Sequence, residues 1–484
     1  MIKFNNTDSI GSFNRWSDEK KQMIHKASLK ILSQVGVSIL NEEARQLLAD
    51  AGAEVEQEVV RIPEELVESA LGTAPERYSI YKTDGTEALD LSPNHVYFGT
   101  GTDMPEFIDL YTGEIRDAVL ADCENAAKVA QQCDAIDWIA PYALAGDKNP
   151  HVADLYHYKA MRKYANKPVL TLSTDEYSLR GIIDMAAAQA GGYEALKEKP
   201  TFVHYAEPVS PLTNTSEALG KLLLCAEYGI PVTYTSGIMA GATGPVTLAG
   251  TLAVGNAECL TGLVIHQLKR PGAPFMYGIE ASIMDMKTTT CIYGGPEYGL
   301  MNSFVGEMAR FYGLPSFGIS GATDSNQYDF QMGAEMMYSM MCAIFGRQNF
   351  VHDNGYMGLG QMGALQSIIG ANELLNFVKR YAKDIEITEE SILFDSVKEV
   401  GIGGNFLERK ETMKKFRNEY YFPKFLNRQR HGSWRSSGSL PMTEKFTRKA
   451  KEIIESDVPV FIDGELEAKF NAIIKEHEDF YGTE

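Results

Sequence analysis

Short apolar runs recur along the middle of this 484-residue chain, and each leads into polar or glycine-rich residues. Seven of them begin near residues 137, 168, 201, 231, 274, 315 and 349. Their spacing of roughly 30 to 40 residues leaves room for one strand, one helix and two loops. Repeated units of this length predict an α/β fold, a (β/α)8 TIM barrel, whose chemistry lies at the carboxyl ends of the strands.

The residues before this repeat predict a helical cap over 1–95. Apolar positions at helical spacing run through 18–50, where Asn41 is a suitable cap for a second helix. Pro63 is placed to open a third helix. Two short alternating runs, at 59–62 and 78–81, read as strands.

A hairpin is expected from Val96 onward, so we predict that the barrel with this entry hairpin spans 96–415. The charged, partly helical residues 416–484 form a C-terminal extension. Two segments compete for the eighth strand, 402–407 and 96–99. The pattern alone leaves both open.

Composition narrows the function. The net charge of −20 argues against nonspecific binding to nucleic acid or an anionic membrane, which both reward basic patches. The mean hydropathy is −0.20, no apolar run is long enough to span a membrane, and the first residues contain no secretory apolar core. Six scattered cysteines without CxxC spacing indicate neither a zinc ribbon nor a redox dithiol, and fit a cytoplasmic location.

Several common catalytic signatures are missing from the sequence. It contains no GxxxxGK[ST] phosphate loop, no GxGxxG after a strand, no HExxH and no GxSxG. No compact group of His, Asp and Glu has metal-ligand spacing, so we expect no metal bound directly by the chain. These absences remove the commonest kinase, dehydrogenase and hydrolase interpretations.

Polar and aromatic residues follow the predicted strands and are expected at one rim. The strand ends carry Tyr142, Ser173, Tyr205, Glu207, Ser236, Glu280, Ser320, Asp324, His352 and Asp353. Further aromatics expected near the rim are Tyr97, Phe98, Tyr277, Phe330 and Tyr356. Ring faces attract a quaternary ammonium, and carboxylates add negative potential. Each aromatic alone also fits packing, and His352 alone fits a hydrogen-bonded core residue.

Four segments make the chain recognisable: IHKASLKILSQVGVSILNEEARQLLADAGAEVEQEVVRIPEELVESAL (24–71), YFGTGTDMPEFIDLYTGEIRDA (97–118), GATDSNQYDFQ (321–331) and HDNGYMG (352–358). They resemble the trimethylamine methyltransferase family over nearly the whole chain. The resemblance implies a (β/α)8 barrel that moves a methyl group from a methylamine to a corrinoid (cobalamin) carried by a separate partner protein. It also implies a homo-oligomer.

Archaeal members carry a pyrrolysine in the barrel mouth, whereas this sequence has only standard residues near 326–329. It therefore resembles the non-pyrrolysine branch, whose substrates are quaternary amines such as glycine betaine, carnitine, proline betaine or butyrobetaine. A quaternary nitrogen is already cationic, so the chain need only hold it, aim one methyl at Co(I) and exclude water.

We assign expected roles on that basis. His352 is the candidate catalytic residue, and Gly355 and Gly358 are expected to admit the corrinoid. The candidate substrate-binding residues are Tyr97, Phe98, Tyr205, Glu207, Glu280, Asp324, Asn326, Gln327 and Tyr356. Two other classes stay open: a non-catalytic betaine-binding subunit, and a lyase or aldolase, against which the absence of a lysine at the strand ends argues.

Overall fold

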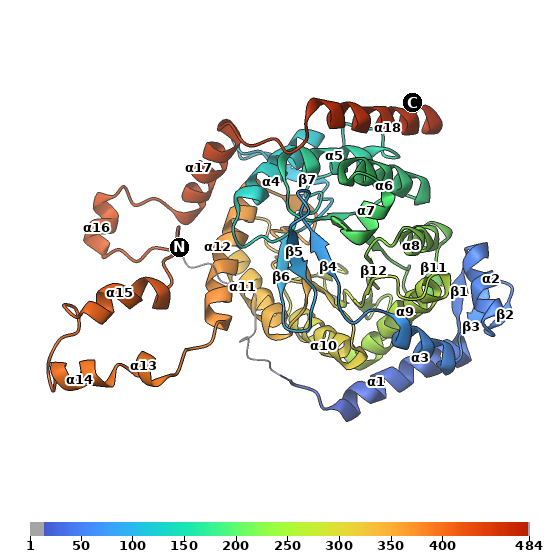
Figure 1. The fold of residues 1–484 in the computed structure, drawn as a ribbon, viewed down its shortest axis with the longest axis horizontal. Helices are drawn as coiled ribbons and strands as arrows, with labels where there is room; N and C mark the ends of the chain where they lie inside the picture. Colours follow the sequence, from blue (N-terminus) through green and yellow to red (C-terminus); the bar gives the residue numbers. More distant parts are fainter. Residues whose placement is uncertain (1–13, 483–484) are drawn as a thin grey trace.

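The computed structural model describes residues 14–482 (Figure 1). Eight short parallel segments lie side by side in it, in the order in which they occur along the sequence. Seven are strands: β6 (Tyr97–Thr100), β9 (Val169–Thr171), β10 (Phe202–Ala206), β12 (Val232–Tyr234), β14 (Phe275–Met276), β17 (Phe317–Ile319) and β18 (Phe350–Asn354). The eighth is a pair of bridge residues, Trp138 and Ile139, between β6 and β9. The predicted apolar runs are thus confirmed as strands or bridges.

The pairings return to their starting strand. One parallel sheet has the order β14-β12-β10-β9, and another has the order β17-β18-β6. Three parallel bridges join the two sheets, Gly99 to Trp138, Ile139 to Val169 and Tyr277 to Ser316. We call these eight segments the strand ring.

The structure decides between the two candidate eighth strands in favour of 96–99. Every residue of β6 is buried, as expected for a parallel strand covered on both faces. Residues 402–407 are exposed, and none of them belongs to a strand. Two adjacent glycines, Gly403 and Gly404, weaken that run as a strand.

A helix follows each segment of the ring and covers its outer face, as Figure 1 shows for β12 and its neighbours. These helices are α4 (Leu120–Gln132), α5 (Ala153–Tyr164), α6 (Glu176–Ala190) with α7 (Tyr193–Glu198), α8 (Ser216–Tyr228), α9 (Leu248–Lys269), α10 (Pro296–Tyr312), α11 (Phe330–Phe345) and α12 (Leu365–Ala382). The Asp175 and Thr215 side chains cap α6 and α8 by accepting backbone N–H bonds. Local sequence signals therefore agree with the helix starts.

The N-terminal region is less helical than the sequence predicts. It contains α1 (Asp18–Lys30), a π-helical turn η1 (Ile31–Val35), β1 (Val37–Ile39), α2 (Glu42–Asp50), β2 (Glu54–Glu56), β3 (Val59–Arg61) and α3 (Glu64–Thr73). Asn41 caps α2 as expected, its side chain accepting the Ala44 N–H at 3.0 Å. β1 pairs with β3 and also with β11 (Thr213–Asn214), so this region is tied to the ring by a small sheet. The prediction about a secretory segment concerns residues outside those described.

A hairpin closes the amino end of the ring. β4 (Ser79–Tyr81) pairs with β5 (Glu87–Asp90), and its Ile80 and Leu89 are buried. They pack in one cluster with ring residues that include Tyr97, Leu170 and Phe350. The ring interior is therefore a filled core, and its carboxyl end is the open one.

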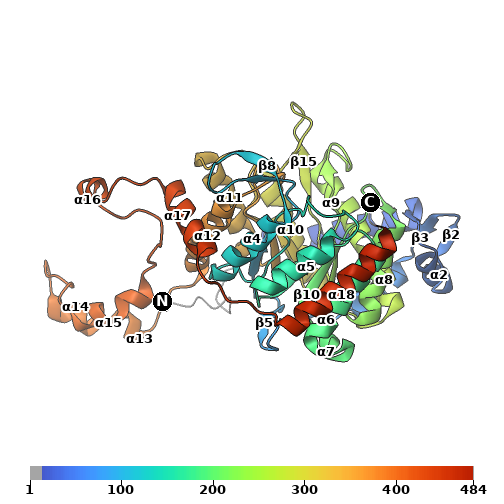
Figure 2. The ribbon, with the colours of Figure 1, turned by 90° about the horizontal axis from the view of Figure 1, so that it is seen from above.

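Two further hairpins lie at the carboxyl end. β7 (Glu106–Ile108) pairs with β8 (Ile115–Asp117) and with β19 (Met362–Gly363), while β15 (Ser282–Met284) pairs with β16 (Cys291–Ile292) and with β13 (Met239–Ala240). Figure 2 shows β8 and β15 on the same side of the molecule, with β5 on the opposite side. The sequence predicts a hairpin from Val96 onward, but Tyr97–Thr100 is the ring strand β6 and the hairpin is formed by β7 and β8. The β15–β16 hairpin is not predicted by the sequence.

After α12 the chain runs outward and then returns. It forms α13 (Glu389–Ile392), α14 (Phe394–Val400), α15 (Lys410–Glu419) and α16 (His431–Ser436), which lie apart from the ring at the left of Figure 1. α17 (Met442–Glu455) then packs on α12, and α18 (Gly464–Tyr481) packs on α5 and α6. The His477 ring contacts the Tyr177 carbonyl at 3.1 Å, which ties α18 to α6.

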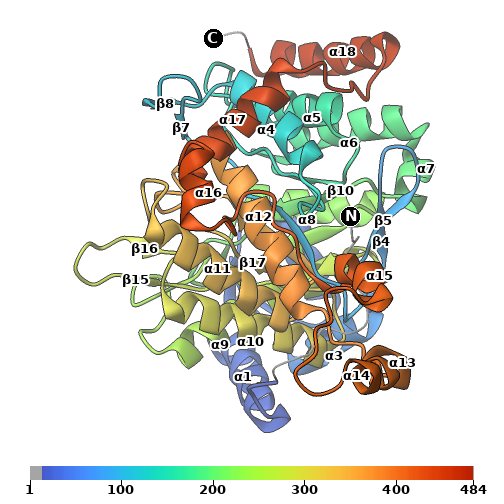
Figure 3. The same ribbon diagram turned by 90° about the vertical axis from the view of Figure 1, so that its left-hand side faces the viewer.

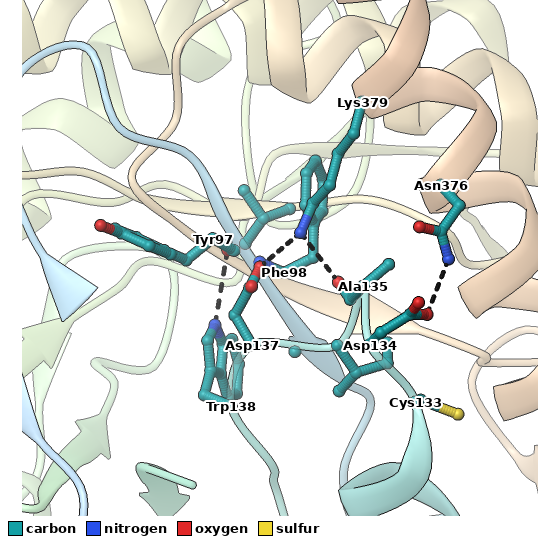
Figure 4. A network of polar contacts seen from close by, with 12 residues as sticks. Tyr97, Phe98, Cys133, Asp134, Ala135, Asp137, Trp138, Asn376 and Lys379 are labelled. Atoms are coloured by element: carbon teal, nitrogen blue, oxygen red, sulfur yellow. Dashed lines mark hydrogen bonds and ion pairs between the residues drawn. The ribbon is translucent and has the colours of Figure 1, made fainter. Parts of the chain in front are cut away.

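Side chains reinforce the place where β6 meets the bridge segment through the Gly99–Trp138 bridge, which we call the seam of the strand ring (Figure 4). Asp137 accepts the Phe98 N–H at 2.9 Å and a bond of 2.9 Å from the Lys379 ammonium on α12. Lys379 also donates to the Ala135 carbonyl at 3.1 Å. A Cβ on Gly99 would lie 2.1 Å from the Trp138 ring, so only glycine lets the strand and the indole approach this closely.

Candidate functional site

Carboxylates from three alternate strands of the ring, β10, β14 and β18, gather at its carboxyl end. Tyr205 and Glu207 lie at the end of β10, Glu280 follows β14, and His352 and Asp353 lie in β18. Because parallel strands present their carboxyl ends at one rim, residues about 75 and 145 positions apart in sequence meet there. We call these five residues the acidic cluster.

The Tyr205 hydroxyl connects two of the carboxylates. It lies 2.7 Å from Glu207 Oε2 and 3.3 Å from Glu280 Oε2, so a single phenol hydrogen serves both groups. Glu280 Oε1 is buried and has no hydrogen-bond partner among the described residues. A buried carboxylate oxygen without a donor is a costly arrangement unless a ligand completes it.

Burial raises the pKa values of Glu207 and Glu280, and repulsion by neighbouring carboxylates adds to the shift of Glu280. The pKa of Glu280 is raised well above its usual value, first by burial and then by Asp353 and Glu207. Burial also raises the pKa of Glu207, although this side chain is open to solvent. Protein atoms crowd round Glu207 in a concave rim while leaving it a path to water, which accounts for both observations. The cluster therefore favours any bound positive charge.

His352 and Asp353 reach the cluster together because β18 is irregular there. The pairing of β18 with β6 shifts register between Val351 and Asn354, and Asp353 has φ +74°. A regular strand would send adjacent side chains to opposite faces. Here His352 Nδ1 lies 2.7 Å from Asp353 Oδ1 and 4.0 Å from Glu280 Oε1.

The His352 ring is poised for a ligand. The 2.7 Å separation from Asp353 lies off the hydrogen-bond direction, and neither ring nitrogen has a hydrogen-bond partner although both are buried. The ring stacks on Trp138 with centroids 5.9 Å apart and an interplanar angle of 7°. This packing fixes the imidazole in place and leaves its polar atoms available.

Aromatic rings surround the acidic cluster. Tyr205 lies 5.7 Å from Phe317, and His352 lies 6.0 Å from Tyr356, measured between ring centroids. Tyr293, from the loop after β16, makes edge contacts with Tyr298 at 5.5 Å and with Tyr356 at 6.3 Å. Ring faces beside carboxylates are the features that bind a cation without a hydrogen-bond donor.

Tyr97 and Phe98 do not lie with the cluster, which corrects their sequence-based placement. They begin β6, so they belong to the amino half of the strand (Figure 4). The Tyr97 hydroxyl accepts the Asp90 N–H of the closing hairpin at 3.1 Å. The Phe98 ring faces outward, 5.6 Å from the Lys379 ammonium on α12. An aromatic at the start of a strand cannot reach the rim.

Two other aromatics expected at the rim also lie elsewhere. The Tyr277 hydroxyl donates to the Asn256 side chain on α9 at 2.6 Å, so this ring faces the helix layer. Phe330, the first residue of α11, is 91% exposed. Neither contacts the residues of the acidic cluster.

The loop 320–329 borders the cluster through Asp324. This carboxylate accepts the Tyr293 and Gly294 N–H groups at 2.7 and 3.0 Å, which positions the Tyr293 ring, and burial raises its pKa. Asn326 and Gln327 are exposed farther along the loop. Asp324 thus acts on the rim through Tyr293, whereas the other two face solvent.

Glycines border the rim beside Tyr356. Gly355 and Gly358 have φ values of +106° and +55°, the left-handed region that glycine adopts without strain. The Gly358 N–H donates to the Ser325 carbonyl at 3.0 Å, which links this turn to the loop 320–329. Both glycines are buried, and an added Cβ would lie 3.2 Å from the Tyr142 hydroxyl at Gly355 and 2.8 Å from the Asn326 side chain at Gly358. They therefore allow close packing of the turn behind the rim, which differs from the open edge expected from the sequence.

Sequence reasoning missed Tyr293 and Tyr298 as residues of the site. Both come from the segment after the unpredicted β15–β16 hairpin, and the Tyr298 hydroxyl donates to Asp353 Oδ2 at 3.3 Å. The only local signal is YGGPEYG, in which Pro296 opens α10. The sequence places Asp353 at a strand end but indicates no role for it, because its inward direction depends on the bulge.

No group of three or more His, Cys, Asp or Glu is arranged to hold a metal ion within residues 14–482.

One described helix, α9, is long and apolar enough to cross a membrane. Most of its residues are buried inside the fold, as in the core helix of a globular protein.

Comparisons with known proteins agree with this arrangement. A sequence model described as trimethylamine methyltransferase (MTTB) matches residues 4–482. The chain is 31% identical to trimethylamine methyltransferase MttB of Desulfitobacterium hafniense over 470 residues, 97% of this chain and 95% of that one. It is 30% identical to a glycine betaine methyltransferase of the same species over 477 residues, 98% and 99% of the two chains.

A solved structure, the Methanosarcina barkeri monomethylamine methyltransferase, shares the fold with a TM-score of 0.51. The match covers 99% of this chain and 90% of that one at 11% identity. At that identity the likeness concerns the α/β fold alone.

Proposed function

Because the chain belongs to the trimethylamine methyltransferase family, we propose that it transfers a methyl group from a quaternary amine to the Co(I) of a corrinoid held by a partner protein. The observation that carries the choice of a quaternary amine is the acidic cluster enclosed by ring faces. The glycine betaine methyltransferase among the relatives supports glycine betaine as the substrate. Carnitine, proline betaine and butyrobetaine share the same cationic head group.

We infer that the strand ring is a (β/α)8 barrel whose carboxyl end is the reaction site. The parallel pairings and the helix after each segment support this interpretation. The division into an N-terminal cap (1–95), a barrel (96–415) and a C-terminal extension (416–484) stays a prediction. So do a cytoplasmic location and a homo-oligomeric state.

In the proposed reaction the substrate nitrogen lies beside Glu207, Glu280 and Asp353. The rings of Tyr205 and Tyr356 contact the remaining methyl groups through their faces. The C–N bond breaks as the C–Co bond forms, the nitrogen keeps the electron pair, and a neutral tertiary amine leaves. Cobalt changes formally from Co(I) to Co(III), so the reaction needs no proton transfer by the chain.

His352 supplies the polar contact for the other end of the substrate. Because both ring nitrogens are unpartnered, whichever carries the N–H can donate to a betaine carboxylate, while the Trp138 stack holds the ring still. Holding both ends aims one methyl group toward the opening. Positioning, water exclusion and charge complementarity are thus the contributions of this chain, and His352 touches the substrate.

The corrinoid is a second substrate that enters at the rim. Gly355 and Gly358 are buried against Tyr142 and Asn326, so in this proposal they shape the turn that carries Tyr356 and do not themselves contact the corrinoid. Asn326 and Gln327 are exposed beside this turn, where they can contact the partner protein or the corrin side chains. Tyr97 and Phe98 take no part in this proposal, since they lie at the other end of β6.

The test is a methyl-transfer assay with the full-length chain. Purified protein is mixed with glycine betaine and a corrinoid protein reduced to Co(I), and cobalt absorbance and the demethylated amine are followed together. We expect one tertiary amine for each methylated corrinoid, and no transfer from trimethylamine. Binding of glycine betaine without transfer from it or from the other three quaternary amines would refute the proposal and favour a binding subunit.

A further inference from the structure

The segment 383–441 leaves the end of α12, runs outward and returns to α17; we call it the arm. Its helices α13, α15 and α16 contain no buried residue, and α14 buries only Ser396. Its exposed apolar residues are Ile385, Ile387, Ile392, Phe394, Val397, Ile402, Phe406, Leu407, Met413, Tyr420 and Phe422. Among the described residues, no other segment of this length exposes so many.

Helices this short do not persist alone in water and are normally stabilised by packing an apolar face. Single exposed apolar residues are ordinary, but a contiguous group marks an interaction site. Contacts with the rest of the chain occur where the arm returns, such as Lys424 with Asp134 at 2.9 Å and the Phe425 N–H with Glu373 at 3.2 Å. The apolar residues in the outer part of the arm are thus not buried by the rest of the described chain.

The arm carries opposite charges in its two halves. Residues 383–408 hold seven acidic and two basic residues, a net charge of −5. Residues 409–435 hold nine basic and two acidic residues, a net charge of +7 with histidine neutral. Within one chain the halves already attract each other, through Arg409 to Glu399 at 2.6 Å and Lys415 to Glu390 at 3.2 Å. A surface with both signs side by side can pair with an inverted copy of itself.

The outer helices of the arm, α13 to α15, are not at the reaction end of the ring. In Figure 3, α13, α14 and α15 lie on the side of β4 and β5, whereas β15 and β16 lie on the opposite side. Figure 2 shows the same separation from above. A protein that brings its corrinoid to the rim would therefore not cover these helices.

We propose that the arm is a self-association surface, on which the arm of a second copy of this chain packs about a two-fold axis. In such a contact the acidic half of one arm faces the basic half of the other, and the same pairing repeats by symmetry. The apolar residues of both arms are then buried between them. This goes beyond methyl transfer, because it assigns an assembly role to a segment whose outer helices α13 to α15 lie away from the rim.

The experiment compares the mass of full-length variants in solution. Phe394 and Leu407, 68% and 74% exposed, are both replaced by Glu in the arm variant. Phe330 and Val246, 91% and 71% exposed outside the arm, are both replaced by Glu in the control. Light scattering after gel filtration and sedimentation equilibrium give the mass over a hundredfold range of concentration. Thermal unfolding confirms that each variant folds.

We expect the wild type and the control to exceed the 53.5 kDa of one chain, and the arm variant to dissociate at least tenfold more readily. Hydrogen exchange at α13 to α15 should slow in the wild type as concentration rises, and should not slow in the arm variant. A monomeric wild type, or an arm variant that associates like the wild type, overturns the proposal. Equal weakening in the control does the same, because it would show a general effect of added charge.

Discussion

Replacing Glu280 with Gln tests whether the acidic cluster recognises positive charge. The substitution keeps the shape of the side chain and, at a pH above the raised pKa of Glu280, removes one negative charge, 3.3 Å from the Tyr205 hydroxyl and 4.0 Å from His352 Nδ1. A cationic nitrogen about 5 Å from the carboxylate gains about 3 kcal/mol at an effective dielectric constant of ~20. The side chain is 24% exposed, so solvent reduces this value. We expect the binding free energy of the cationic ligand to weaken by about 1.4–3 kcal/mol, which is a dissociation constant about 10- to 150-fold larger.

The assay is a cycle that changes the ligand charge and the protein charge separately. Calorimetry measures binding of glycine betaine and of 3,3-dimethylbutyrate, in which a neutral carbon replaces the cationic nitrogen. Glu280→Gln should weaken only the cationic ligand, so that the preference for it shrinks by the same factor. Glu465→Gln, on the exposed face of α18, should change neither affinity. If Glu280→Gln weakens both ligands equally, charge recognition by this carboxylate is refuted.

The same variant has a defined pH signature. Because the folded protein raises the pKa of Glu280, it binds a proton that the unfolded chain releases above its ordinary value near 4.5. Wild-type stability from this group therefore falls as pH rises from that value through the raised pKa, by roughly 1.4 kcal/mol for each pH unit in that interval. Glu280→Gln removes the loss, so its melting temperature relative to wild type should rise with pH. Cation affinity of the wild type should increase over the same range.

Three further substitutions test the rings and the seam of the strand ring. Tyr205→Leu should weaken quaternary amine binding by about 0.5–2 kcal/mol in calorimetry, whereas Tyr205→Phe keeps the ring face and most of the affinity; equal losses would contradict a ring contact. Lys379→Met leaves Asp137 without its ammonium partner and should lower the free energy of unfolding by about 3–5 kcal/mol in urea titrations. An unchanged midpoint would show that the ion pair does not stabilise the fold. Gly99→Ala should lower the free energy of unfolding by about 1–3 kcal/mol, because the added methyl group would collide with the Trp138 ring. Gly333→Ala should not lower it, because no atom lies within 4 Å of the added Cβ.

The positions of the ring strands follow from the sequence because their signal is local. Residues 202–206 and 350–354 are almost entirely buried, so their apolar runs carry the pattern of parallel strands directly. The sheet formed by β1 and β11 has no such signal. Its partners lie about 175 residues apart and contribute only two register pairs, so nothing local to residues 37–39 indicates the pairing.

The same distinction separates the site residues that the sequence finds from those it does not. Glu207, Glu280 and His352 end apolar runs, and the position of a strand end is enough to place them at the rim. Tyr97 is expected there from its residue type, but its position at the start of β6 sends it to the opposite end. Asp353 depends on a bulge, and Tyr293 depends on a hairpin and on Asp324. Both placements depend on tertiary contacts, which a local sequence pattern does not show.

The cost of the acidic cluster and its proposed use have one origin. Glu207, Glu280 and Asp353 repel one another in a crowded rim, and this repulsion adds to burial in raising the pKa of Glu280. Either a proton or a bound cation relieves it, so the two compete for the same negative charge. A quaternary ammonium cannot donate a hydrogen bond, so the carboxylates contribute through charge and the rings through their faces. Departure of the neutral tertiary amine removes the positive charge, restores the repulsion and weakens product binding, which favours release after each transfer.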